Sequence, residues 1–146
     1  MDEGCGILQS LKQNENYKIH DDENANELAL QPGVTRTFGS ALTGDIWQNS
    51  GYGLYVASSL CLLGGHFILS SGKNAIFLNP GGRNSYFSAS YGTTICLSLD
   101  MDKIKHVSAI IDTIVKEGES KAKSYHGRVL SASKISSIAS IIDKIP

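Results

Sequence analysis

The stretch GYGLYVASSLCLLGGHFILSSGKNAIFL, residues 51–78, decides the fold. Its first half, residues 51–63, is the strongest apolar segment of the chain, and it ends at Gly64-Gly65 as a buried helix with a glycine C-cap would. The second half reads HFILS, a turn at residues 71–73, and NAIFL, which is typical of a β-hairpin. A buried helix followed by strands predicts an α/β domain with helices on one sheet face.

Strands are predicted to continue beyond residue 78. A turn at residues 79–82 (NPGG) is followed by SYFSAS at residues 85–90 and by TTICLSL at residues 93–99. Alternation in the last segment places three apolar side chains on one sheet face, namely Ile95, Leu97 and Leu99. Together with the hairpin upstream, these segments predict a meander of strands.

Two helices are predicted ahead of residue 51. One runs from Gly6 into ILQSL. The other covers ENANELAL, residues 23–30, with Asp21 and Asp22 as N-cap candidates and Pro32-Gly33 just beyond its end. The following residues, 33–50, are rich in Gly, Ser, Thr and Asn, which predicts a long loop. Loops of this length in a small domain are usually functional or disordered.

Two further helices are predicted after the strands. Apolar residues recur at helical spacing over residues 101–117 and again over residues 134–145, as in amphipathic helices. The polar stretch between them, residues 118–128, is interpreted as a linker.

Size and composition predict one globular unit. The 146 residues are 41% hydrophobic, which is enough for a single packed core. The 13 basic and 14 acidic residues give a formal net charge of −1 without long runs of either sign, so no nucleic-acid partner is expected. The sequence has no secretion-signal pattern at its start and no apolar run long enough to span a bilayer, which predicts a cytoplasmic protein without a membrane partner.

The cysteines and histidines show no metal-binding pattern. Cys5, Cys61 and Cys96 are widely spaced and form no CxxC or Cys/His cluster. We therefore expect reduced, buried thiols rather than a disulfide or a zinc site. The four histidines are equally scattered, and no metal-ligating residue is predicted.

A DxGxG motif stands ahead of the first predicted helix, with Asp2, Gly4 and Gly6. An ionised carboxylate only accepts hydrogen bonds, so Asp2 can accept one from an exocyclic amine such as that of adenine. The glycines carry no side chain that would block a flat base. Because an isolated DxGxG is more often a simple turn, the motif alone leaves both interpretations open.

Two more motifs follow in order. Gly51, Gly53 and Leu54 open the buried helix, where backbone N–H groups and the helix dipole stabilise phosphates, although a tight loop-to-helix turn explains the glycines equally well. Gly92 and Thr93 begin the alternating strand, where the hydroxyl can reach a ligand through water or belong to an ordinary β-branched strand residue. Neither the P-loop nor the Rossmann pattern occurs.

In order and spacing, these motifs resemble the ATP-binding domain of the GHKL superfamily, which gyrase, heat-shock chaperones, histidine kinases and mismatch-repair proteins share. The similarity is strongest to the histidine-kinase-like branch, through NSGYGLYVASSLCLLGG and YGTTICLSL. It implies a two-layer α/β sandwich of the Bergerat type, N-terminally incomplete. Residues 1–100 would form the partial ATP-binding domain, and residues 101–146 a C-terminal helical extension.

The resemblance also implies a set of nucleotide-binding residues: Asp2, Gly4, Gly6, Gly51, Gly53, Leu54, Gly92 and Thr93. Asp2 would accept a hydrogen bond from the adenine amine, with Thr93 as a second contact on the adenine side. The glycines at 51 and 53 would face the phosphates. Residues 33–50 would be the mobile lid over the triphosphate.

In this family, a helix ahead of the first glycine motif supplies an asparagine that holds Mg²⁺ and, in several branches, a glutamate that acts as general base. That helix would lie before Met1. No residue of this chain is therefore predicted to be catalytic or to ligate a metal. Mg²⁺ would be a possible cofactor whose family ligand is missing. The strand that leads into Asp2 would be missing as well. An incomplete sheet would favour a protein partner or self-association.

Three functions remain open. The first is binding of ATP or ADP to regulate a partner protein, and the second is a protein-interaction module with a vestigial nucleotide pocket. The third is an active ATPase or kinase-like domain that takes its missing elements from another chain. Nucleotide titration separates the first from the second, and ATP turnover tests the third.

Overall fold

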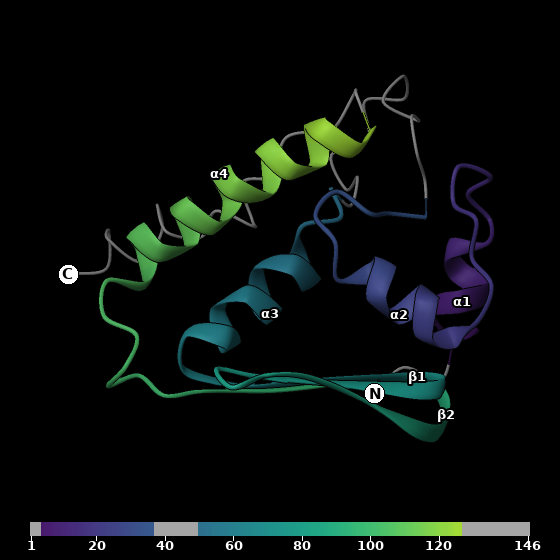
Figure 1. The fold of residues 1–146 in the computed structure, drawn as a ribbon, viewed down its shortest axis with the longest axis horizontal. Helices are drawn as coiled ribbons and strands as arrows, with labels where there is room; N and C mark the ends of the chain where they lie inside the picture. Colours follow the sequence, from purple (N-terminus) through teal and green to yellow (C-terminus); the bar gives the residue numbers. More distant parts are fainter. Residues whose placement is uncertain (1–3, 37–49, 127–146) are drawn as a thin grey trace.

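The computed structural model describes residues 4–36 and 50–126. The elements follow in the order α1 (Gly6–Leu11), α2 (Asp22–Ala29), α3 (Gly53–Gly64), β1 (Gly65–Asn79), β2 (Gly82–Leu99) and α4 (Val107–His126). These helices lie on one side of a two-stranded antiparallel sheet, and α4 lies beyond α3, farther from the strands (Figure 1). The described fold is therefore mixed α/β, as predicted.

A single hairpin replaces the predicted meander of strands. β1 continues through residues 71–73, where the sequence predicts a turn, and β2 unites the two segments predicted as separate strands. The chain reverses at residues 79–82, where Asn79 pairs with Gly82. The prediction of a turn at 71–73 is wrong, and the reversal at 79–82 is confirmed.

A β-bulge takes the place of the expected turn. The register shifts between Ser71 and Gly72 and again between Gly72 and Asn74, and Gly72 has a φ of 61°. The Asp22 carboxylate occupies the space where a Cβ of residue 72 would stand, and it accepts a hydrogen bond from the Lys73 backbone N–H at 3.0 Å. Glycine at a positive φ thus lets the strand continue through a bulge that α2 supports.

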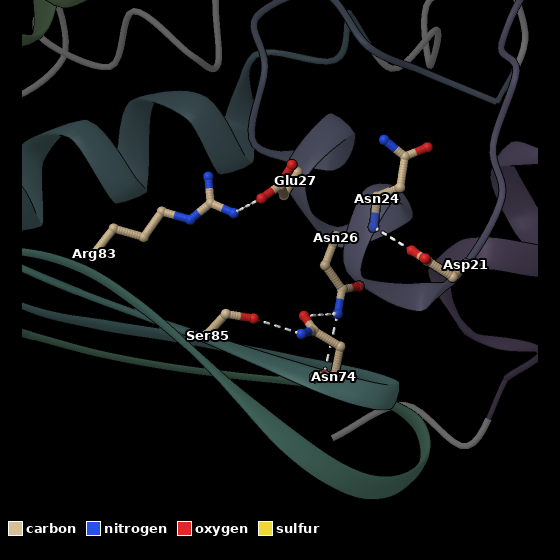
Figure 2. A network of polar contacts seen from close by, with 7 residues as sticks. All are labelled: Asp21, Asn24, Asn26, Glu27, Asn74, Arg83 and Ser85. Carbon is tan, nitrogen blue, oxygen red and sulfur yellow. Dashed lines mark hydrogen bonds and ion pairs between the residues drawn. The ribbon is translucent and has the colours of Figure 1, made fainter.

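A buried polar cluster joins α2 to the sheet (Figure 2). Asn26 is fully buried. Its Nδ2 donates to the Asn74 Oδ1 at 3.1 Å, to the Asn74 carbonyl at 3.1 Å and to the Ser71 carbonyl at 3.2 Å. The Asn74 amide donates in turn to Ser85 Oγ of β2 at 2.7 Å. Because buried polar groups require such partners, the cluster fixes α2 over the bulge.

Two contacts at the protein surface flank this cluster in Figure 2. Asp21 is the N-cap of α2, as predicted for position 21, and its carboxylate accepts from the Asn24 backbone N–H at 2.8 Å. Glu27 forms an ion pair with Arg83 of β2. An exposed ion pair contributes about 0.2–1 kcal/mol, so the buried amide is the stronger restraint on α2.

The strongly apolar helix α3 lies at the centre of the core. One set of buried residues packs between the helices and the sheet: Leu30, Cys61, Phe67, Leu69, Ile76 and Leu78. A second set packs between α3 and α4: Tyr52, Tyr55, Val56, Leu60, Ile104, Ile114, Val115 and Ala122. The prediction of a buried helix that ends at the Gly-Gly pair is confirmed.

Helix α4 differs from its prediction at both ends. It begins at Val107 and continues to His126, through polar residues that the sequence suggests are a linker. The continuation packs on α3, since Ala122 is fully buried in the cluster that contains Tyr55. At Gly118 the approach is close, because a Cβ there would lie 2.5 Å from Tyr55 Cε1 and 3.3 Å from Pro32 Cβ. Glycine therefore lets the helix pack closely on α3. The helix predicted at 134–145 lies outside the described residues.

Replacing Gly118 with alanine is expected to destabilise the protein, although alanine is the better helix former. The added methyl group would overlap the Tyr55 ring, and overpacking costs about 1–3 kcal/mol. This exceeds the roughly 1 kcal/mol gained in helix propensity. Ser120→Ala, at an exposed position of α4, is the control and should keep or slightly raise the stability. Urea denaturation measures both variants, and an unchanged midpoint for Gly118→Ala would contradict the close packing.

Candidate functional site

A cavity of about 710 Å³ lies between α1, the segment after α2, the start of α3 and β2. Small-molecule pockets commonly measure about 300–1,000 Å³. Four of the residues implied by the GHKL resemblance line this cavity, namely Gly4, Gly6, Leu54 and Thr93. Residues from the beginning, middle and end of the predicted ATP-binding domain therefore meet at one place.

Ser71 of β1 fixes the side of the cavity where α1 meets β2. Its Oγ accepts a hydrogen bond from the Ile7 backbone N–H at 3.0 Å and donates to the Gly92 carbonyl at 3.1 Å. The Thr93 hydroxyl lies 3.3 Å from the same oxygen. Gly6 has a φ of 74°, and a Cβ there would lie 3.1 Å from Ser71 Oγ. A glycine at position 6 thus allows α1 to begin directly against the sheet.

The strand register determines which side chains of β2 face the cavity. Thr93 pairs with Ser71 and Ile95 pairs with Leu69, which is fully buried. Residues directly opposite each other in an antiparallel pair share a sheet face. Thr93 and Ile95 therefore point to the helix side, and Thr94 points to the other side. The predicted common face of Ile95, Leu97 and Leu99 agrees with this register.

The two glycines of the GYG motif have different surroundings. Gly51 has a φ of 74°, and a Cβ there would overlap the Val34 backbone. Its carbonyl accepts a hydrogen bond from the Gly33 N–H at 3.2 Å. Gly53 opens α3, is exposed, and would place a Cβ where no atom of the described residues lies within 4 Å. Packing therefore explains glycine at position 51, whereas the described neighbours of Gly53 do not require glycine there.

The remaining predicted site residues lie beside the cavity or outside the described part of the chain. Gly53 and Gly92 directly precede the lining residues at 54 and 93, and Gly51 packs on the lining residue at 34. Asp2 lies outside the described residues, and so does most of the loop predicted to be a lid, residues 37–49.

The charge and polarity of the lining suit a ligand with a flat apolar part and an anionic part. Arg36 is the charged side chain in the described wall, and most of the other lining residues are apolar or glycine. Beside Arg36, the Thr35 N–H donates to the Tyr17 phenol oxygen at 3.4 Å. Burial raises the pKa of Tyr17, so this phenol stays neutral at physiological pH.

The thiols differ from the expectation that all are buried. Cys61 is buried, and burial raises the pKa of its thiol, which keeps it protonated and unreactive. Cys5 and Cys96 are exposed, because Cys5 precedes α1 at the cavity and Cys96 lies on the uncovered face of β2. All three are free thiols.

Sequence reasoning missed Ser71 as a site residue and treated it as part of a turn. The feature that could have identified Ser71 is its position in the strand. It is a polar residue that faces the helices, between buried apolar residues of β1. In residues 4–36 and 50–126, no group of three or more His, Cys, Asp or Glu side chains is placed to hold a metal ion. None of the helices in these ranges has the length and apolar content needed to cross a membrane.

Comparisons with protein-family models, with curated proteins and with solved structures find no significant match to this chain. Membership of the GHKL superfamily is therefore a proposal. Its support is the order of the motifs in the sequence and the positions of their residues around one cavity.

Proposed function

We propose that this chain binds an adenine nucleotide, ATP or ADP, in the cavity between α1 and β2, as a histidine-kinase-like member of the GHKL superfamily. One observation carries the proposal: three motifs that are far apart in the sequence contribute Gly4 and Gly6, Leu54, and Thr93 to the wall of the same cavity. Local sequence patterns do not require these residues to meet, and their meeting at one cavity is the arrangement that a shared ligand would need.

The proposed ligand has a definite orientation. The base lies between the glycines that precede α1 and Thr93 of β2, where side chains are small and a hydroxyl is available. The phosphates lie towards Gly53 and Arg36, because the N-terminus of a helix and a guanidinium both stabilise anions. By the resemblance, Asp2 accepts a hydrogen bond from the adenine amine.

The proposal extends to the fold and to a regulatory role. In this proposal, the hairpin and the helices on one of its faces would form part of a two-layer Bergerat sandwich. Tyr52, between the two glycines of the GYG motif, is fully buried in the cluster that joins α3 to α4. A ligand at the GYG motif therefore acts on residues that hold α4, which supports control of a partner protein through the C-terminal extension. The proposal does not include hydrolysis or phosphate transfer.

Titration calorimetry with ATP and with ADP is expected to show binding, and Thr93→Val is expected to weaken it about tenfold, which corresponds to ~1.4 kcal/mol. Valine keeps the shape of threonine and removes the hydroxyl that faces the cavity. Thr94→Val is the matched control, because the neighbouring side chain points to the opposite face of the sheet. Absence of binding heat with either nucleotide for the wild-type chain would refute the proposal and favour the interaction module.

A further inference from the structure

Strand β2 has a long outer edge without the features that usually prevent strand pairing. Residues 84–99 contain no charged residue and no proline. The inner edge of β2 pairs with β1, and in residues 4–36 and 50–126 no backbone hydrogen bond from another segment reaches residues 93–98. Natural edge strands are commonly protected by lysine, proline, shortness or a covering element. Among the described residues, nothing therefore pairs with this edge, and it can accept another strand.

Apolar side chains accompany the open edge. Ile95 and Leu97 point to the helix side of the sheet, yet they are 45% and 51% exposed. Tyr91 and Met101, at the two ends of the segment, are 94% and 63% exposed. Single exposed apolar residues are common, but a row of them along an unpaired strand marks an interaction surface.

We propose that two copies of this chain pair through the outer edges of β2, over residues 93–99, and form a continuous four-stranded antiparallel sheet. The paired segment shares Thr93 and Ile95 with the wall of the cavity, but the pairing uses the outer backbone edge of β2 and does not depend on nucleotide binding. Three or more strands with an apolar face are more stable than an isolated hairpin, so the pairing strengthens the sheet of each copy.

Symmetry fixes the register of this pairing. In a two-fold antiparallel pair, one residue lies opposite its own copy, and its neighbours pair crosswise. With Cys96 at the centre, Ile95 of each copy lies opposite Leu97 of the other, so both half-exposed side chains become covered. Tyr91 and Met101 are equally far from Cys96 in the sequence. Tyr91 of each copy therefore comes near Met101 of the other copy, at both ends of the paired segment. The register of β1 and β2 shifts between the Ser71–Thr93 and Gly72–Ser90 pairs. This irregularity ends the regular part of β2 and limits the segment that can pair with a second copy.

A second copy fits this edge better than a charged partner does. An uncharged strand offers no ionic complementarity to another protein, and in a symmetric pair it brings no like charges together. The four exposed side chains contribute roughly 500 Å² per copy, against about 800 Å² per partner in a standard interface. The paired backbone adds to this area, so the expected dimer is of modest affinity.

Sedimentation velocity over a range of protein concentrations is the first test, with the full chain and without nucleotide. We expect the mass of a dimer at the higher concentrations and at least a tenfold larger dissociation constant for Leu97→Lys. Leu63→Lys is the matched control, since Leu63 is a similarly exposed leucine (54%) on α3, and it should dimerise as the wild type does. The proposal would be overturned if the wild-type chain does not form a dimer with a second copy. This holds whether the chain is found alone or in a complex with a different protein.

Thiol cross-linking tests the register, even where Leu97→Lys does not fold. A short bismaleimide is expected to join two wild-type copies through Cys96, because residues opposite each other across paired strands lie close together. The product should disappear in Cys96→Ser and persist in Cys5→Ser, whose thiol is also exposed. Cross-linking through Cys5 instead, or a dimer unaffected by Leu97→Lys, would place the interface elsewhere.

Discussion

Asn26→Asp is expected to lower the free energy of unfolding by about 3–5 kcal/mol, enough to unfold a marginally stable domain. The Asn26 side chain is fully buried and donates to three oxygens, two on Asn74 and one on Ser71. Aspartate has almost the same size but replaces the donor by an acceptor. A carboxylate would then face the oxygens of Asn74 and Ser71 without a hydrogen to donate to them, which leaves these partners unsatisfied.

The same substitution predicts a specific pH dependence. Burial among acceptors favours the protonated form of the new carboxyl group, so its pKa in the folded protein rises above the unfolded value of about 3.9. The folded state then binds more protons than the unfolded state, and stability falls as the pH rises through this window. The free energy of unfolding that Asn26→Asp loses relative to the wild type should therefore be larger at pH 7 than at pH 4.

Asn84→Asp is the control for this experiment, because it makes the same chemical change at an exposed position of β2. Its effect should stay within about 0.5 kcal/mol. Urea denaturation followed by circular dichroism at several pH values measures both variants. Equal stability of the two variants would mean that the amide of Asn26 does not hold α2 on the sheet.

The bulge at Gly72 illustrates what the sequence could not reveal. Ser-Gly-Lys at residues 71–73 is equally compatible with a hairpin turn and with a bulge. The choice depends on Asp22, which is far away in the sequence and accepts the Lys73 N–H. By contrast, the N-cap at Asp21 and the end of α3 at Gly64 were predictable, because the signals for both lie within one helical turn.

Helix α4 and the cavity show the same limit. The residues after Gly118 have a polar composition that indicates a linker, but packing on α3 accounts for the helix there, through the buried Ala122 and the close approach of Gly118 to Tyr55. In the cavity, glycines and Thr93 belong to recognisable motifs, whereas Ser71 acts through hydrogen bonds to two other elements. Motif order can therefore predict which residues line a site, but not the groups that hold the walls together.

Gly51→Ala is expected to lower the free energy of unfolding by roughly 2–5 kcal/mol. Alanine at the observed φ of 74° costs about 1–2 kcal/mol. The new methyl group would also overlap the Val34 backbone, and overpacking adds about 1–3 kcal/mol. Because Val34 belongs to the wall of the cavity, the strain would also shift that wall. Thermal unfolding measures the loss, and an unchanged midpoint would show that position 51 tolerates a side chain.

Gly53→Ala is the matched partner of this variant and separates packing from ligand binding. Alanine at position 53 meets no atom of the described part of the chain within 4 Å and requires no positive φ, so the unfolding midpoint should not fall. If phosphates approach the backbone there, the methyl group blocks them, and ATP affinity in calorimetry should fall at least tenfold, ~1.4 kcal/mol. If Gly53→Ala loses ATP affinity and keeps the wild-type unfolding midpoint, the result supports a ligand at Gly53 and not an effect on packing. Retained affinity would instead move the phosphates away from α3, even if the nucleotide itself binds.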